Sequence, residues 1–267
     1  MAACALLALL AATGGSIQAA PMPPMPAQAL VRATPALWEI RDADTTIYLF
    51  GTFHTLDGRT VWFGDKVRDA FDRSGELVLE TIVPDPAAIQ AARGRVTEIA
   101  PDGTAQLKPF VAQTQAVVNE GRTAGLSVEN GADSVLRRVA ENVGKPVGGL
   151  ERFEDQLGTL ASIPTPPAAV TRPSASAVSI TVSDLLSAWT TGNTGAFSNM
   201  LAGFEAKSPV AYRMLIADRN ARWGQWIANR LEKPGTVFVA VGTGHLAGKD
   251  SVQQWLAARG IASTRVV

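Results

Sequence analysis

Apolar residues occur along the chain in short runs that have the spacing of β-strands. Residues 37–41 alternate apolar and polar side chains, and the turn residues 42–44 separate them from a second run at residues 45–50. This pattern predicts a β-hairpin. Residues 76–81 and 236–241 each contain an uninterrupted apolar run bounded by polar residues or glycine, which is typical of buried strands.

Helical spacing follows the first hairpin. Val67, Ala70 and Phe71 recur at the interval of one helix face, so we expect a helix over residues 65–71. With a strand on either side, this segment predicts a right-handed βαβ unit whose two strands run parallel. The remaining helices are predicted over residues 107–125, 132–143, 153–163, 183–189, 193–205, 209–231 and 251–259.

The order of these elements predicts an α/β fold. Strands lie near both ends of the mature chain, with a short strand expected at residues 145–151 and a last one at 261–267. We therefore expect a central mixed, largely parallel sheet with flanking helices. Residues 36–267 would form a single domain, and residues from about 84 to 231 would form a helical insertion.

The first 35 residues differ in composition from the rest. No charged residue precedes Arg32, and the first part is an Ala- and Leu-rich run too short to span a bilayer. We interpret residues 1–20 as a signal peptide that lacks a basic start, and residues 21–35 as an unstructured Pro- and Ala-rich spacer. The protein would then be exported to the periplasm, with no membrane span after cleavage. The alternative is a cytosolic protein with an apolar tail.

Composition narrows the classes of function. Lys and Arg together number 24, as do Asp and Glu, so nothing points to a nucleic-acid partner. The single cysteine, Cys4, allows neither a disulfide framework nor a cysteine-based zinc site. A peptide or small-molecule substrate remains the expectation, and the sequence says nothing about oligomeric state.

The two histidines of the chain share one local context. Residues 51–54 (GTFH) and 242–245 (GTGH) each follow an apolar strand, so Gly-x-x-His places His54 and His245 just beyond a strand end. Sites in α/β proteins form beyond the carboxyl ends of the strands. A histidine at a strand end is often only a structural hydrogen-bonding group, but the matched placement favours a shared function for this pair.

Two glutamates are candidates to join these histidines. Glu80 and Glu151 each end an apolar strand. Two imidazoles with one or two carboxylates suit a divalent metal such as Mn, Co or Zn, and the metal-bound water could attack a carbonyl. A metal-free site would instead use one histidine as a general base. In the simplest alternative, both glutamates are solvated charges at strand ends.

An arginine in the last long helix is a further candidate. Arg219 lies in the segment Asp218-Arg219-Asn220 of the predicted helix 209–231. Its guanidinium could orient a carboxylate or stabilise an oxyanion. The competing interpretation is an ordinary surface charge on a helix.

These segments, taken in order, resemble the TraB/GumN family, which includes the Tiki-type metalloproteases. The resemblance is carried by both Gly-x-x-His strands, Leu77-Val78-Leu79-Glu80, the block Gly144 to Leu157, and Asp218-Arg219-Asn220 with Trp223. It implies an α/β fold shared with erythromycin-esterase-like and ChaN-like proteins. It also implies metal-dependent peptide hydrolysis carried by His54, Glu80 and His245, with Glu151 and Arg219 as further residues of the site.

We therefore expect an exported, metal-dependent hydrolase that cleaves a peptide or a related amide or ester bond. His54, Glu80, His245 and Arg219 are the expected catalytic residues. His54, Glu80, His245 and Glu151 are the expected metal ligands. A non-catalytic periplasmic binding protein and a metal-free esterase with a histidine base are the alternatives.

Overall fold

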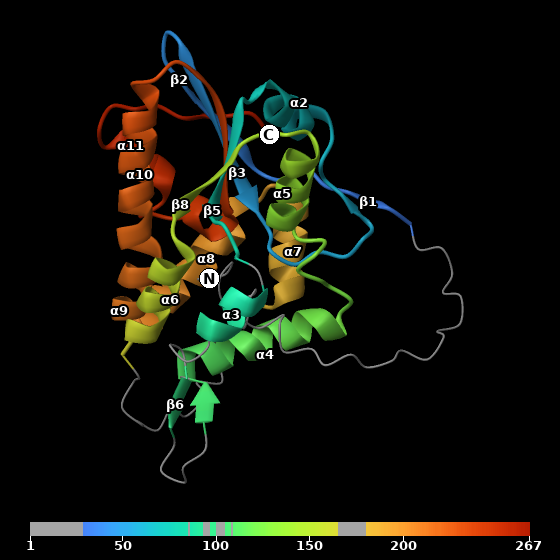
Figure 1. Ribbon diagram of the computed structural model, residues 1–267, viewed down its shortest axis with the longest axis vertical. Coiled ribbons are helices and arrows are strands. Elements are labelled where there is room, and N and C mark those ends of the chain that lie inside the picture. Colours follow the sequence, from blue (N-terminus) through green and yellow to red (C-terminus); the bar gives the residue numbers. More distant parts are fainter. Residues whose placement is uncertain (1–28, 85, 93–96, 100–104, 108, 165–179) are drawn as a thin grey trace.

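A six-stranded sheet forms the centre of the molecule (Figure 1). The computed structural model describes residues 29–84, 86–92, 97–99, 105–107, 109–164 and 180–267. The strand order is β10-β2-β3-β9-β5-β8, in which β3, β9, β5 and β8 are parallel and β2 and β10 are antiparallel to their neighbours. The predicted α/β class with a mixed, mostly parallel sheet is confirmed.

The strands of this sheet are β2 (Leu37–Arg41), β3 (Thr45–Thr52), β5 (Glu76–Thr81), β8 (Val147–Glu151), β9 (Gly235–Gly242) and β10 (Thr264–Arg265). Two small ladders lie outside it, namely β1 (Val31–Arg32) with β4 (Thr60–Val61) and β6 (Thr97–Ile99) with β7 (Ala105–Leu107). Neither ladder was predicted, because two- and three-residue strands are too short to show a hydrophobic period. The last predicted strand, 261–267, is shorter than expected.

The helices are α2 (Asp65–Arg73), α3 (Pro86–Ala92), α4 (Pro109–Thr123), α5 (Ala132–Asn142), α6 (Phe153–Ser162), α7 (Val182–Thr190), α8 (Thr194–Lys207), α9 (Pro209–Tyr212), α10 (Asp218–Leu231) and α11 (Val252–Ala257). Each helix predicted from the sequence is present with its ends moved by a few residues. The predicted helix 209–231 is not a continuous α-helix, because a π-helical segment at Arg213–Ala217 lies between α9 and α10.

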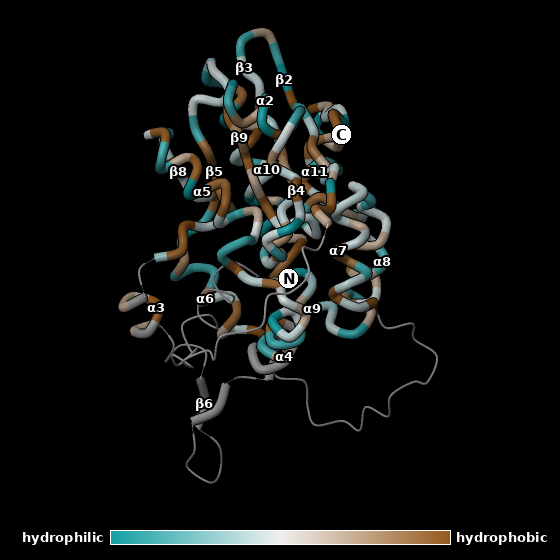
Figure 2. Tube along the Cα trace, turned by 90° about the vertical axis from the view of Figure 1, so that its right-hand side faces the viewer, coloured by the Kyte–Doolittle hydropathy of each residue, from teal (hydrophilic) through white to brown (hydrophobic). Residues whose placement is uncertain are grey.

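Both faces of the sheet are covered by helices, with α10 and α11 on one side and α2, α5 and α7 on the other (Figure 1). Side chains alternate between the faces along each strand. On β9, Val237, Val239 and Val241 pack towards α10 and α11, whereas Phe238 and Ala240 join the core on the other face. Figure 2 shows the apolar colour concentrated on such buried strands as β5 and β9.

The same alternation decides where the polar ends of two strands point. On β5, Glu80 follows Val78 on the α10 face. On β3, Thr52 follows Tyr48 and Phe50 on the α5 face. The strands therefore present a carboxylate to one helix layer and a hydroxyl to the other.

The place of β9 in the sheet was not predicted. The sequence indicated parallel strands for the βαβ unit at residues 45–81, and β3 and β5 are parallel, but β9 lies between them and pairs with both. Strand order in a sheet depends on contacts between distant segments and leaves no trace in local periodicity. Because β9 lies between β3 and β5, the second Gly-x-x-His lies between the first one and Glu80.

Along the helix from α9 to α10, pairs of adjacent buried residues recur every four positions. They are Ala211 and Tyr212, Leu215 and Ile216, Arg219 and Asn220, and Trp223 and Gly224, followed by Ile227. The π-helical segment contains the second of these pairs. Such segments occur mostly as single turns inside α-helices, frequently at functional sites.

Candidate functional site at the carboxyl ends of the strands

Five sequence-predicted residues meet at one edge of the sheet. His54 and His245 follow β3 and β9, and Glu80 and Glu151 lie at the ends of β5 and β8. Because these four strands are parallel and adjacent, their carboxyl ends share one edge. Arg219 reaches the same edge from α10 and contacts Glu80, Glu151 and His245. His54, Glu80 and His245 come from distant parts of the sequence and lie close together at this edge.

The two Gly-x-x-His segments pack against each other through their glycines. A Cβ atom on Gly51 would lie 2.8 Å from Oγ1 of Thr243, and one on Gly242 would lie 2.9 Å from Nε2 of His54. The Thr243 hydroxyl also donates to the carbonyl oxygen of Thr52 at 2.9 Å. Each glycine thus leaves room for a residue of the other segment, which explains on steric grounds why the pattern occurs twice.

His54 is held by an aspartate from α5. Its Nδ1 lies 2.7 Å from Oδ2 of Asp133, and Oδ1 of Asp133 accepts a hydrogen bond of 2.8 Å from the Thr52 hydroxyl. A carboxylate can only accept hydrogen bonds, so Nδ1 carries a proton, and in the neutral ring the lone pair is on Nε2. Nε2 is the atom next to Gly242.

His245 is held in the same way by an amide. Its Nδ1 lies 2.6 Å from Oδ1 of Asn220, and its Nε2 lies 3.3 Å from Nη1 of Arg219 and 3.9 Å from Oε2 of Glu80. The ring packs on Trp223, with 4.5 Å between ring centroids. The side chain of His245 is 1% exposed and that of His54 is 9% exposed.

Arg219 joins two carboxylates inside the protein. Its guanidinium forms ion pairs with Glu80 and Glu151, and its Nε donates to Oε2 of Glu151 at 3.1 Å. Glu80 also accepts a hydrogen bond of 2.8 Å from Nε2 of Gln156 on α6. The side chains of Arg219 and Glu80 are each 1% exposed, so this cluster is shielded from solvent and its charges interact strongly.

The surroundings shift the pKa values of the site in opposite directions. Burial would raise the pKa of Glu80, but the Arg219 guanidinium holds it at about 2. Burial and Arg219 lower the pKa of His245 well below 6.5, so this ring is neutral. Burial would also lower the pKa of His54, but Asp133 outweighs it and raises the value. Burial raises the pKa of Glu151.

The comparison with known proteins bears on this arrangement. A model of the TraB/PrgY/gumN family matches residues 36–104 and 85–265, which is nearly all of the domain that carries the site. The chain belongs to the TraB/PrgY/gumN family. A search of the curated proteins and a search of the solved structures each returned no match.

Three residues that support the site in this TraB/PrgY/gumN family member were not singled out from the sequence. All three come from helices. Asp133 contacts His54, Gln156 contacts Glu80, and Asn220 contacts His245. Asp133 lies in the first turn of α5, where an acidic residue is common because it stabilises the helix N-terminus. Its sequence position therefore carried no signal of a contact with His54.

The donor atoms can be compared with the needs of a divalent cation. Both histidines hold Nδ1 against a protein acceptor, as metal-ligating histidines do, and a Cβ on Gly242 would lie 2.9 Å from His54 Nε2 and 3.6 Å from Glu80 Oε2. Within the described ranges, however, no group of three or more His, Cys, Asp or Glu side chains is placed to hold a metal ion. The donors fit a cation in chemistry but not in spacing.

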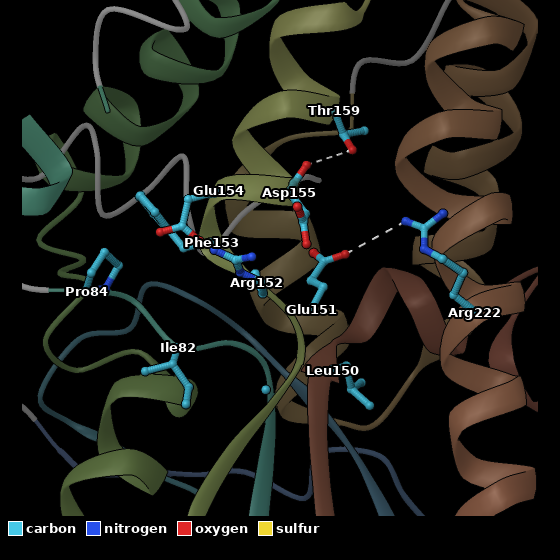
Figure 3. Close-up of a pocket in the computed structure, with 11 residues that line it drawn as sticks. Ile82, Pro84, Leu150, Glu151, Arg152, Phe153, Glu154, Asp155, Thr159 and Arg222 are labelled. Atoms are coloured by element: carbon cyan, nitrogen blue, oxygen red, sulfur yellow. Dashed lines mark hydrogen bonds and ion pairs between the residues drawn. The ribbon is translucent and has the colours of Figure 1, made fainter. Parts of the chain in front are cut away.

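A cleft of about 770 Å³ opens beside this cluster (Figure 3). Its wall includes Glu151, whose Oε2 lies 4.0 Å from Nη2 of the exposed Arg222. Because Glu151 also binds Arg219, the cleft borders the buried charges directly. The other lining residues include Ile82, Pro84, Arg152 and Asp155.

The N-terminal predictions concern residues that lie mostly outside the described part of the chain. The predicted signal peptide and most of the spacer fall on residues 1–28, outside the described residues. Export to the periplasm therefore stays a prediction. None of the helices in the described part of the chain has the length and apolar character needed to cross a membrane.

Proposed function

We propose that this member of the TraB/PrgY/gumN family is a hydrolase of a peptide or a related amide or ester bond, with His54 as its general base. The observation that carries the proposal is the contact of 2.7 Å between His54 Nδ1 and Asp133 Oδ2. It leaves the lone pair of Nε2 on the side of Gly242 and Glu80. A base oriented by a carboxylate is a recurring arrangement in acyl-transfer enzymes.

The proposed roles of the other residues follow from their contacts. Nε2 of His54 would take a proton from the attacking water. Arg219 would hold Glu80 in place, since its guanidinium is already engaged with two carboxylates. His245 would be a neutral ring whose Nε2 faces Glu80. The cleft bordered by Glu151 would receive the substrate.

A divalent cation is the second candidate feature, favoured by the engagement of both Nδ1 atoms. His54, Glu80 and His245 would be its ligands. Mn, Co or Zn would supply an activated water or polarise a carbonyl. Glu151 is the weakest of the predicted ligands, because both its oxygens contact Arg219. Since the spacing does not fit, we derive no catalytic step through the cation.

The first test is hydrolysis of a panel of peptide and ester substrates by the purified protein. We expect turnover by the wild-type chain and none by His54→Gln, which removes the base. If compounds of the panel stabilise the protein against heat but are not cleaved, the result would instead favour a non-catalytic binding protein.

Metal binding can be measured without any substrate. If the cation binds, adding Mn²⁺, Co²⁺ or Zn²⁺ will raise the melting temperature, since a ligand at 100 times its Kd stabilises the folded state by about 2.7 kcal/mol. The double variant His54→Ala, His245→Ala should lose this response. An unchanged melting temperature in the wild type, together with no metal bound after purification without chelators, would leave the metal-free hydrolase.

Filling the space at Gly242 tests whether the site works as a unit. In Gly242→Ala the added Cβ would meet Nε2 of His54 at 2.9 Å, and we expect a loss of turnover of about 100-fold from the displaced ring. Backbone strain does not complicate the result, because Gly242 has a φ of −52°. Gly158→Ala on α6 is the matched control, as its Cβ would meet nothing within 4 Å. Equal turnover in the two variants would mean that the room left by Gly242 is not needed to position the His54 ring.

A further inference from the structure

Asn220 is buried beneath the second Gly-x-x-His, and its amide contacts three groups. Its Nδ2 donates to the backbone carbonyl of Asp250 at 2.7 Å and to that of His245 at 3.3 Å. Its Oδ1 lies 2.6 Å from Nδ1 of the His245 ring. The side chain is thus bound to both the ring and the main chain of the same histidine.

These contacts determine the orientation of the amide. Carbonyl oxygens only accept hydrogen bonds, so the amide atom that faces the carbonyls of His245 and Asp250 must be the NH2 group. The oxygen of Asn220 then faces the ring. Because this oxygen is also only an acceptor, Nδ1 of His245 must carry a proton.

A second contact leads to the same protonation state independently. Arg219 is a donor at every nitrogen, and its Nη1 lies 3.3 Å from Nε2 of His245. An Nε2 that faces a donor presents its lone pair. The two contacts, on opposite sides of the ring, therefore agree on a neutral ring protonated at Nδ1.

The two histidines reach this tautomer through different partners. Asp133 on α5 holds Nδ1 of His54, and Asn220 on α10 holds Nδ1 of His245. The partners lie in the two helix layers on opposite faces of the sheet. The second histidine is therefore oriented without bringing another carboxylate to a cluster that already contains Glu80 and Glu151.

We propose that Asn220 is the positioning residue of the second Gly-x-x-His. It fixes His245 as the Nδ1–H tautomer, with the Nε2 lone pair directed towards Arg219 and Glu80. It also ties the turn η3 (Thr243–Leu246) to the loop that ends at Asp250. The tautomer follows from hydrogen bonding alone, whereas its effect on turnover rests on the proposed hydrolase function.

Nitrogen NMR of the imidazoles tests the tautomer directly. The chain has only two histidines, so ¹⁵N-histidine labelling yields two ring spectra, and His54→Gln assigns them. In alkaline buffer, where both rings are neutral, we expect His245 to show a protonated Nδ1 and an unprotonated Nε2. A wild-type spectrum in which His245 carries its proton on Nε2 would overturn the proposal, and this outcome does not depend on the folding of any Asn220 variant.

Two substitutions of Asn220 separate positioning from packing. Asn220→Asp retains an acceptor for Nδ1 and should keep the Nδ1–H signature. Asn220→Ala removes it, and the His245 Nδ1 signal should shift because its N–H loses the hydrogen-bond acceptor. An unchanged His245 spectrum in folded Asn220→Ala would contradict the positioning role. Asn229→Ala, an exposed position on the same helix, is the control that should leave the spectrum unaltered.

Turnover gives a second readout. Loss of a supporting contact of this kind costs about 10- to 100-fold in activity, so kcat should fall by that factor in Asn220→Ala while KM changes little. A large rise in KM with unchanged kcat would contradict the positioning role of Asn220. If the wild-type protein shows no turnover but its His245 spectrum is as expected, the hydrolase proposal fails and the tautomer assignment stands.

Discussion

Replacing Asp133 by asparagine is expected to lower turnover by about 100- to 10,000-fold, nearly as much as replacing His54 itself. The carboxylate accepts from both the Thr52 hydroxyl and His54 Nδ1. An asparagine has only one accepting oxygen, so if that oxygen keeps Thr52, its NH2 group faces the ring. Nε2 would then carry the proton and could no longer act as a base. Steady-state kinetics with a substrate found in the panel would measure the loss.

Three comparisons make this prediction specific. The double variant His54→Gln, Asp133→Asn should be no slower than His54→Gln alone, because residues that act as a unit are not additive. Asp72→Asn, at an exposed position on α2, should leave turnover unaltered. Full activity in Asp133→Asn would mean that His54 is not oriented by this aspartate during the reaction.

Replacing Arg219 by methionine is expected to destabilise the fold by about 3–5 kcal/mol, as removal of one partner from a buried ion pair does. Glu80 and Glu151 would lose the cation that both of them contact. The measurement is urea unfolding, with the free energy extrapolated to water. Arg222→Met on the same helix is the control, since Arg222 is largely exposed and should contribute less than about 1 kcal/mol.

A compensating variant distinguishes loss of charge pairing from loss of packing. Adding Glu80→Gln and Glu151→Gln to Arg219→Met removes the uncompensated charges and should restore most of the lost stability. If the triple variant is as unstable as Arg219→Met, the arginine stabilises the fold through its packing on Trp223, which lies 4.6 Å from the guanidinium.

The effect of Arg219 should also depend on pH. The pKa of Glu80 is lowered from 4.5 to about 2 in the folded protein, so its contribution to stability is present above pH 4.5 and is lost as the pH falls towards 2. Arg219→Met removes the cause of this shift. The difference in unfolding free energy between wild type and variant should therefore be largest near neutral pH and shrink below about pH 4.5.

Local patterns were sufficient for the strands of the central sheet, for most of the helices and for the residues that meet at the edge of the sheet. The apolar runs before Gly51 and Gly242 predicted the two strands that carry the histidines, and the βαβ pattern placed His54 and Glu80 at one edge. Adjacent parallel strands then make convergence a matter of topology. These inferences succeeded because they rest on periodicity and on the rule for strand ends.

The remaining parts depend on contacts that no local pattern records. Asp133 is 79 residues from His54 and looks like any acidic residue at a helix start. The position of β9 between β3 and β5 follows from pairing with both neighbours, which alternation along one strand cannot reveal. Arg219 looked like a possible surface charge because a single arginine on a helix says nothing of the two carboxylates it meets.

The π-helical turn at Arg213–Ala217 sets a length requirement on the chain. A regular α-helix advances by about 100° per residue, so a step of four residues overshoots a full turn by about 40°. The buried pairs from Ala211 to Ile227 recur at steps of four, and the wider π turn offsets part of this drift. A relative with one residue fewer in this segment would direct the arginine about 100° away from the sheet edge. Segment length at this point, as well as residue identity, should therefore decide which relatives can build the same charge cluster.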